Sequence, residues 1–406
     1  MKYDLEKLID RDGTYATKWE TYTEGNKSGS ISSIGTDLQG DGLLPMWVAD
    51  MDFKTAQPII DALTFRAQHG IFGYTLASEN YFQSIINWFE SRYGWKIDKE
   101  WIIPTSGVVP AIQFAINTFC SRGNAVLIQG PVYHPFYRVI KSAGCHVVSN
   151  SLIHSSDGYK MDFEDLEEKV KDKNIKLAIL CSPHNPVGRV WSREELRTFG
   201  KICIENGVLI IADEIHCDLV APEVVFTPFL KVNELFLPNT IVCTAPSKTF
   251  NLAGMHLANT IIADEHLRKD YKNYMVVNSV AGGLNPFSLI AAEVAYNKGG
   301  DWLEQVLIYI WANYEFLKEF IDKYLPRIIL TKLEGTYLAW VDFRCLNLEP
   351  QSLEDLIQNK AKLLFNQGYI FGDEGIGFQR INIACPRKVL ELGLWRLKEA
   401  IEELEI

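Results

Sequence analysis

The sequence predicts an α/β fold, in which a mainly parallel sheet is covered by helices on both faces. Between about residues 46 and 290, short apolar runs recur without alternation, as strands that are buried on both faces require. Amphipathic stretches with helical spacing separate these runs. The chain has 406 residues, which exceeds the usual span of one hydrophobic core. We therefore expect two domains.

The predicted strands of the first domain are rich in Val, Ile, Leu and Ala. They are 125–129, 177–181, 208–212, 240–244 and 260–263. One of the helices between them opens at Ser106–Gly107, and another has a capping box of Ser192 and Glu195. Strands that alternate with helices in this way favour parallel pairing.

The two ends of the chain differ from the middle. Residues 1–45 are polar and glycine-rich, which is typical of an irregular arm. From about residue 300 we expect a helix over 302–324, a strand over 336–343, a helix capped by Ser352, a strand over 378–384 and a terminal helix. The last has an apolar face of Leu390, Leu394, Leu397, Ile401 and Leu404. We therefore predict an arm that completes the small domain (1–45), a large domain (46–290) and a smaller α+β domain (291–406).

Composition limits the class of protein. The chain is 47% apolar and 22% charged, as in ordinary globular proteins, and its net charge of −11 argues against nucleic acid as a partner. No run of eighteen apolar residues predicts a membrane span. The charged start lacks the apolar core of a signal peptide, and the eight scattered cysteines never form Cys-x-x-Cys. We expect free thiols and a cytoplasmic location.

Three neighbouring strands end in polar residues. Asn185 follows 177–181, Asp213 follows 208–212, and Lys248 follows 240–244. Ligands bind beyond the carboxyl ends of parallel strands, so these side chains should meet at one edge. A desolvated lysine is a candidate Schiff-base nucleophile, an aspartate can hold a protonated ring nitrogen, and an amide can bond a phenolic oxygen. This combination predicts pyridoxal 5'-phosphate (PLP).

Other segments fit the same cofactor. The helix start at Ser106–Gly107–Val108 offers free N–H groups to a phosphate, and Ser247 can add its hydroxyl. Tyr133 is placed to stack on a ring. Arg380, in an otherwise mainly apolar strand, can clamp a substrate carboxylate.

Each residue also has a structural explanation when it is taken alone. Lys248 would then be a paired surface lysine, Asp213 a helix cap, Tyr133 a core residue and Arg380 a cross-strand ion-pair partner. Asp213, Glu214 and His216 could also suggest a metal site. It is disfavoured because 213 and 214 point to opposite faces of a continuing strand. The convergence of five loops favours the cofactor.

Eight ordered motifs, spread over nearly the whole chain, resemble a known family. They are LPMWVADMDF (44–53), FGYT (72–75), GVVPA (107–111), CSPHNPVGRVW (181–191), DEIH (213–216), APSKTFNLAG (245–254), GTY (335–337) and RIN (380–382). The sequence is similar to the fold-type I, aspartate-aminotransferase-like PLP enzymes. Within them it most resembles the cystathionine β-lyase/C–S lyase group of PatB, MalY and cystalysin. The resemblance implies a large domain with a mainly parallel seven-stranded sheet.

The resemblance also implies a role for individual residues. Lys248 would hold the cofactor and move the Cα proton, and Tyr74 would reach the phosphate of the other subunit of a homodimer. The residues implied to contact the cofactor are Tyr74, Gly107, Val108, Val109, Tyr133, Asn185, Asp213, His216, Ser247 and Lys248. Those implied to contact the amino-acid substrate are Trp47, Asn185, Tyr337 and Arg380.

Two substitutions bear on the reaction. Aminotransferases of this type commonly have tyrosine at the position of His216, and Asn-Pro-Thr-Gly where this chain has Asn185-Pro-Val-Gly188 preceded by His184. Both features match the lyase group. The expected reaction is β-elimination at L-cystathionine or another L-cysteine S-conjugate, which yields a thiol, pyruvate and ammonia. An aminotransferase for aromatic or other amino acids remains an alternative, as does a regulatory protein that retains the PLP fold.

Overall fold

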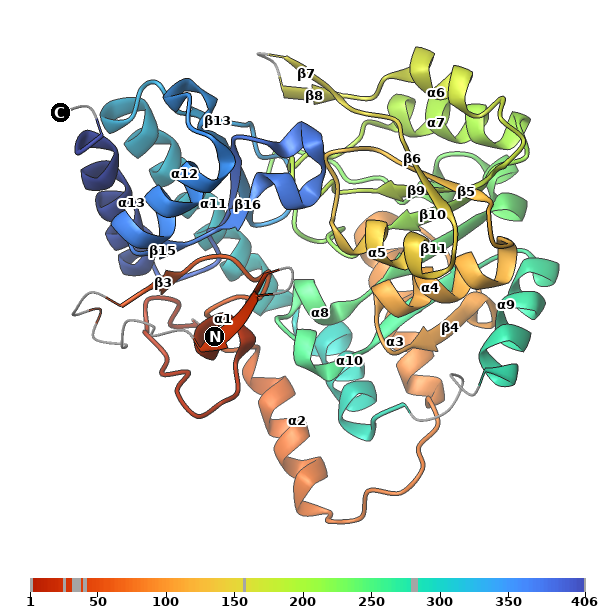
Figure 1. Cartoon of the computed structure of the whole chain (residues 1–406). Helices are drawn as coiled ribbons and strands as arrows, with labels where there is room; N and C mark the ends of the chain where they lie inside the picture. The colour runs from red at the N-terminus through yellow and green to blue at the C-terminus, as the bar shows by residue number, and fades with distance from the viewer. Residues whose placement is uncertain are drawn as a thin grey trace.

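The computed structural model describes residues 3–24, 27–30, 38, 42–155, 158–278 and 284–404. Its largest sheet has seven strands in the order β4-β12-β11-β10-β9-β5-β6 (Figure 1). Their bounds are β4 Ile102–Thr105, β5 Ala125–Ile128, β6 His146–Ser149, β9 Ile175–Cys181, β10 Leu209–Asp213, β11 Thr240–Thr244 and β12 Ala258–Ile262. The β12 strand is antiparallel to both of its neighbours, and the other pairs are parallel. The predicted mainly parallel, seven-stranded sheet is therefore confirmed.

Helices cover both faces of this sheet, because its central strands are buried on both sides. In β9, Leu177 and Ile179 belong to one apolar cluster, whereas Ala178 and Leu180 belong to the other. The first cluster includes residues of α4 (Val108–Phe119), α5 (Pro135–Ser142) and α9 (Glu265–Val277). The second includes residues of α3 (Glu79–Tyr93), α7 (Arg193–Glu205) and α10 (Pro286–Lys298). The continuous apolar runs in the sequence therefore correctly predicted helices on both faces of the sheet.

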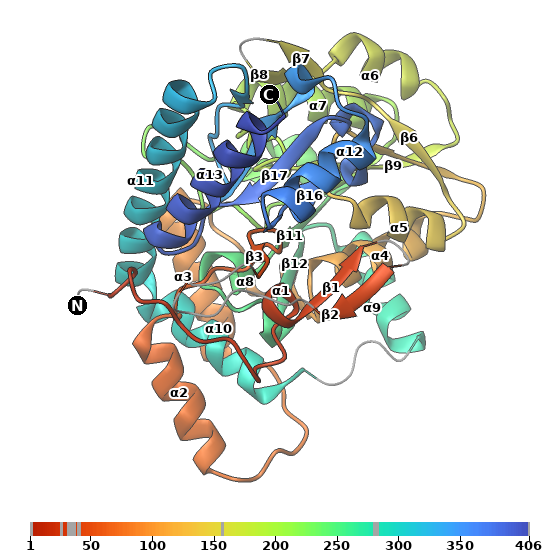
Figure 2. The ribbon, with the colours of Figure 1, turned by 60° about the vertical axis from the view of Figure 1, so that its left-hand side comes forward.

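The C-terminal part contains a smaller antiparallel sheet in the order β13-β14-β17-β16. Its strands are β13 Ile329–Leu330, β14 Leu338–Asp342, β16 Asn366–Gln367 and β17 Phe378–Asn382. The helices α11 (Gly300–Tyr324), α12 (Pro350–Asp355) and α13 (Arg387–Glu402) lie beside it (Figures 1 and 2). The predicted boundary at 290 falls inside α10, which packs against α2 (Gln57–Gln68) and α3. The division into domains stays a prediction.

Two details of this part differ from the sequence expectation. Ser352 does not cap its helix, because α12 already begins at Pro350, whose fixed φ suits a first turn. Leu404 does not extend the apolar face of the last helix, since α13 ends at Glu402 and Leu404 is 49% exposed.

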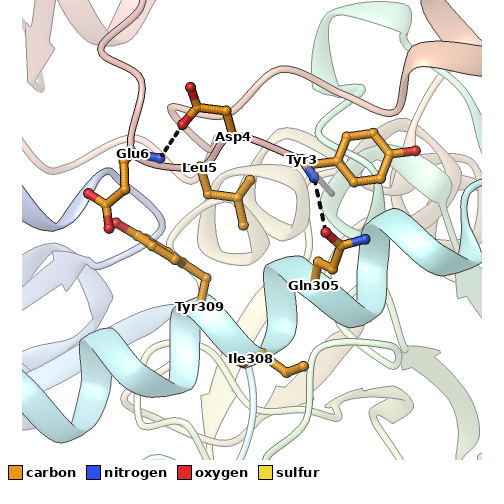
Figure 3. Close-up of a pocket in the computed structure, with 7 residues that line it drawn as sticks. All are labelled: Tyr3, Asp4, Leu5, Glu6, Gln305, Ile308 and Tyr309. Atoms are coloured by element: carbon orange, nitrogen blue, oxygen red, sulfur yellow. Dashed lines mark hydrogen bonds between the residues drawn. The ribbon is translucent and has the colours of Figure 1, made fainter. Parts of the chain in front are cut away.

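The N-terminal segment is more regular than an irregular arm. It includes α1 (Thr17–Glu20) and the strands β1 (Thr21–Glu24) and β2 (Lys27–Ser30), which pair with each other. Farther along, β3 (Leu44–Pro45) pairs in parallel with β15 (Leu363–Leu364) of the C-terminal part. Figure 3 shows the start of the chain on α11, where the backbone N–H of Tyr3 donates to the Gln305 side chain (3.0 Å). The groove there is lined by none of the predicted site residues.

Two further expectations concern the chain as a whole. All eight cysteines are free thiols in the structure. Among the described residues, none of the helices is both long and apolar enough to cross a membrane.

Candidate active site

A cavity of 440 Å³ lies at the carboxyl ends of three adjacent parallel strands. In the sheet register, Asp213 of β10 stands beside Cys181 of β9 and Cys243 of β11. The segments that follow these strands therefore emerge side by side, as predicted. The lining of the cavity includes Ala49, Ser106, Gly107, Val108, Val109, Pro110, Tyr133, Arg138, Asn185, Asp213, His216, Ser247, Lys248 and His256.

Lys248 lies in the short helix α8 (Pro246–Thr249), directly after β11. Its Nζ donates a hydrogen bond to the carbonyl oxygen of Ala49 (2.7 Å). The hydroxyl of the next residue, Thr249, donates to the buried carboxylate of Asp218 (2.8 Å), which holds α8 in place. Burial lowers the pKa of Lys248 to about 8, although the carboxylate of Asp50 opposes this effect. An appreciable fraction of this amine is therefore uncharged near neutral pH, as a nucleophile must be.

Asp213 faces the same cavity from the end of β10. Its Oδ1 accepts a hydrogen bond from the backbone N–H of Ile215 (3.1 Å). Burial nevertheless raises the pKa of this carboxyl to about 7, and the positive charge of Lys248 offsets only part of the rise. A carboxylate in this position is suited to a cationic partner inside the cavity.

Arg380 is a buried cation without an acidic partner. It is 3% exposed, and none of the described Asp or Glu side chains forms an ion pair with it. Its Nη1 donates to the Asn185 side-chain oxygen (2.9 Å), and its Nη2 donates to the Trp47 carbonyl (3.2 Å) and to the Asn366 side chain. Its Nε has no hydrogen-bond partner among the described residues, and burial lowers its pKa to about 10. A carboxylate would supply the charge that this site lacks.

The start of α4 forms one end of the cavity. Gly107 occupies the N-cap position with φ of +139°, a conformation that favours glycine. The first backbone N–H groups of an α-helix have no partners within the helix, and its dipole attracts anions. Ser106 and Ser247 also line the cavity. This end is therefore suited to a phosphate.

His216 lines the cavity, and Tyr337 lies beside it. Their rings are 6.0 Å apart, and the Tyr337 hydroxyl donates to the same Ala49 oxygen that accepts from Lys248 (2.8 Å). His216 is 2% exposed, and its Nδ1 has no hydrogen-bond partner among the described residues. Burial lowers its pKa well below the usual value, so the imidazole is neutral. It can accept or donate a hydrogen bond without adding charge.

Comparison with known proteins identifies the family. A family model described as aminotransferase class I and II matches residues 49–397. The chain belongs to this family. It is 39% identical to "Cystathionine beta-lyase PatB" of Bacillus subtilis, over 98% of this chain and all of that protein, and 32% identical to "Protein MalY" of Escherichia coli, over 98% and 99%. Among solved structures, it matches cystalysin from Treponema denticola, which contains a pyridoxal 5'-phosphate cofactor, with 36% identity, a TM-score of 0.92 and full coverage of both chains. It also matches the PLP-bound C–S lyase from Staphylococcus hominis, with 34% identity, a TM-score of 0.89 and 98% coverage of each.

Four predicted site residues of this chain do not line the cavity: Trp47, Tyr74, Tyr337 and Arg380. Arg380 and Tyr337 are joined to it through the Asn185 side chain and the Ala49 oxygen. The indole N–H of Trp47 donates to the Lys18 carbonyl (3.1 Å), its ring packs with Leu364, and its backbone oxygen accepts from Arg380. Tyr74 is fully exposed in the single chain. Its expected role toward a second subunit stays a prediction.

The structure also adds residues to the site that sequence reasoning missed. Ala49 acts through its backbone oxygen, which no side-chain pattern can reveal. Arg138 and His256 line the cavity, although neither belongs to a strand end. Arg138 could have been found, because it lies in the helix that begins at Pro135, just after Tyr133.

Proposed function

We propose that the chain is a PLP-dependent carbon–sulfur β-lyase. It would act on L-cystathionine or other L-cysteine S-conjugates and release a thiol, pyruvate and ammonia. The observation that supports this most is the convergence of Lys248, Asp213 and the Asn185–Arg380 pair at one cavity. The names of PatB, cystalysin and the C–S lyase, at 34–39% identity, favour the same activity.

The chemistry of the cavity fits PLP. The start of α4 and Ser247 would hold the phosphate, Tyr133 would pack against the ring, and Asp213 would pair with the ring nitrogen. The phenolic oxygen of the ring could bond to Asn185 or to His216 Nδ1, which has no hydrogen-bond partner among the described residues. Lys248 would supply the covalent attachment. The phosphate, the ring nitrogen and the ring oxygen would thus each have a suitable polar or charged group nearby.

The side chains then divide the work. When bound, PLP supplies an electron sink for the negative charge that develops at Cα. Arg380 would bind the α-carboxylate and so orient the Cα–H bond, while the Lys248 amine removes the Cα proton. The buried surroundings of Lys248 keep its pKa near the working pH, which suits proton transfer. The thiolate leaves from Cβ.

The neutral His216 distinguishes the lyase from its main alternative. The residue expected in an aminotransferase is a tyrosine, whose hydroxyl donates to the ring oxygen. His216 has no such hydroxyl and is held beside Tyr337. His216 thus favours the lyase, and an aminotransferase built from the same residues is the second candidate.

The test uses the purified holoenzyme with L-cystathionine. We expect thiol and pyruvate in equal amounts, and their loss in Lys248→Ala, whose backbone and neighbours are unchanged. Addition of a 2-oxo acid separates the two candidates. Amino transfer to that acid without thiol or pyruvate release would overturn the lyase proposal.

We also propose a homodimer with shared active sites. The segment between α2 and α3 exposes four large apolar side chains: Ile71, Phe72, Tyr74 and Leu76. Contiguous exposed apolar residues are typical of interaction surfaces. In such a dimer Tyr74 would reach the phosphate held by the partner.

A further inference from the structure

Arg138 is a second unpaired cation of the active-site cavity. It lies in α5, is solvent-exposed, and lines the cavity together with Tyr133 and Asn185. In the part of the chain that the structure describes, no acidic side chain pairs with it. Its positive charge acts on Tyr133, where it opposes the rise in pKa that burial causes. Its guanidinium group is therefore free to bind an anion at the cavity.

The two arginines lie at different depths. Arg380 is buried, whereas Arg138 is exposed. His134 follows Tyr133 in the chain, and burial together with the charges of Arg380 and Arg138 lowers the pKa of its imidazole to about 4. Both cations thus act on the same segment of the cavity wall, one from the interior and one from the mouth.

This arrangement constrains the substrate. If the α-carboxylate binds Arg380, which is buried, and Cα lies near Lys248, the thiol portion would extend toward the exposed part of the cavity. Arg138 is an exposed residue of the cavity lining and has the planar, two-pronged geometry that pairs with carboxylates. A second carboxylate at the far end of the substrate would meet it there.

We propose that Arg138 binds the distal carboxylate of the substrate, so that the enzyme prefers cysteine conjugates whose thiol portion carries a carboxylate. The proposal rests on the lyase function proposed above. A cation at the mouth also offsets the repulsion that a chain of net charge −11 exerts on an anionic substrate. The start of α4 and Ser247, which also line the cavity, would hold the phosphate, so Arg138 is not required there.

The experiment compares three substrates on the holoenzyme: L-cystathionine, S-(2-carboxyethyl)-L-cysteine and the uncharged S-propyl-L-cysteine. In Arg138→Met, we expect kcat/KM to fall by about 10- to 100-fold for the two carboxylated substrates, mainly through KM. For S-propyl-L-cysteine the change should stay below about twofold. Arg138→Lys should recover most of the loss, since it restores the charge.

Lys141→Met is the matched control, because Lys141 is an exposed cation one turn farther along α5 and does not line the cavity. It should leave all three substrates unaffected. An equal loss for all three substrates in Arg138→Met, or release of PLP on dialysis measured by absorbance, would overturn the inference and assign Arg138 to the cofactor or the fold. Thiol release from none of the substrates by the wild-type enzyme would instead overturn the proposed function, and this inference with it.

Discussion

At the scale of single residues, the pKa of Lys248 determines when the apoprotein can attach its cofactor. Burial lowers this pKa to about 8, so the amine is largely protonated below pH 8 and becomes nucleophilic above it. The rate of covalent PLP uptake should therefore rise through a midpoint near pH 8. Stopped-flow absorbance measures this rate, with Nα-acetyl-lysine, whose amine has an ordinary pKa of about 10.4, as the reference. A midpoint equal to that of the free amine would contradict the prediction.

Asp213 and Glu214 are adjacent buried acids with different surroundings. Asp213 faces the cavity, whereas Glu214 Oε1 accepts from the backbone N–H of Phe229 (2.6 Å). Asp213→Asn should lower kcat by about 10²- to 10³-fold, because the amide cannot balance a ring cation. PLP should stay attached to Lys248, as borohydride reduction and mass spectrometry will detect. Glu214→Gln is the control, and an equal loss of kcat there would argue against a specific role for Asp213.

The predicted site residues that the structure brings together as expected are those whose position follows from strand ends. Asn185, Asp213 and Lys248 meet because parallel strands bring their carboxyl ends together. Trp47 was placed by motif alone, and the direction of its ring depends on packing between β3 and β15, distant segments whose contact no local pattern encodes.

At the scale of elements, a buried charge cluster attaches α1 to the segment around Ala49. Lys18 is 1% exposed, and its Nζ donates to Asp52 Oδ2 (2.6 Å) and to the Asp50 carbonyl (3.3 Å). The indole N–H of Trp19 donates to the other oxygen of Asp52 (2.9 Å). These contacts hold in place the backbone that accepts from Lys248.

Removal of one member of this cluster should therefore be costly. Lys18→Met should lower the free energy of unfolding by about 3–5 kcal/mol, because the buried Asp52 carboxylate loses its close partner and keeps only the longer ion pair with the partly exposed Arg11 (3.4 Å). Urea unfolding followed by circular dichroism measures the change. The exposed Arg197–Glu194 pair provides the control, since Arg197→Met should have a much smaller effect. Equal effects of the two variants would refute a special role for the buried cluster.

The elements of the sheet were predictable to different extents. The three central parallel strands follow from uninterrupted apolar runs, and their bounds agree within two residues. The strands β4 and β6 were missed. The first contains Pro104 and the second is a partly exposed edge strand beginning at His146, so neither has the composition of a doubly buried strand.

At the scale of the whole molecule, the exposed segment between α2 and α3 predicts the oligomeric state. We expect light scattering to give twice the chain mass of 46.2 kDa. Phe72→Asp should shift the protein toward the monomer and weaken PLP retention, because it places a charge in an apolar interface and removes Tyr74 from the partner's site. Leu235→Asp introduces the same charge at another exposed apolar residue and should do neither. A fully active wild-type monomer would rule out the shared site.

The contacts between the part of the chain with the large sheet and the C-terminal part could not be predicted from the sequence. The backbone N–H of Val132 and the hydroxyl of Tyr137 both donate to the Phe371 carbonyl, at 2.9 and 3.0 Å. Arg380 reaches Asn185 across the same junction. These contacts join residues more than 190 positions apart, and their partners are in part backbone atoms.

The oxygen of Ala49 has a consequence for how variants of this protein will behave. One carbonyl accepts from both Lys248 and Tyr337, and a carbonyl has two lone pairs, so its bond to Tyr337 persists when the amine departs to attach a cofactor. The loaded and empty forms thus share a fixed scaffold point that belongs to the main chain. Substitutions at position 49 would hardly reveal the role of this oxygen, because replacements such as Ala49→Ser or Ala49→Gly keep the backbone carbonyl. Only chemistry that alters the peptide unit itself, such as an ester at the following bond, would reveal how much the site depends on it.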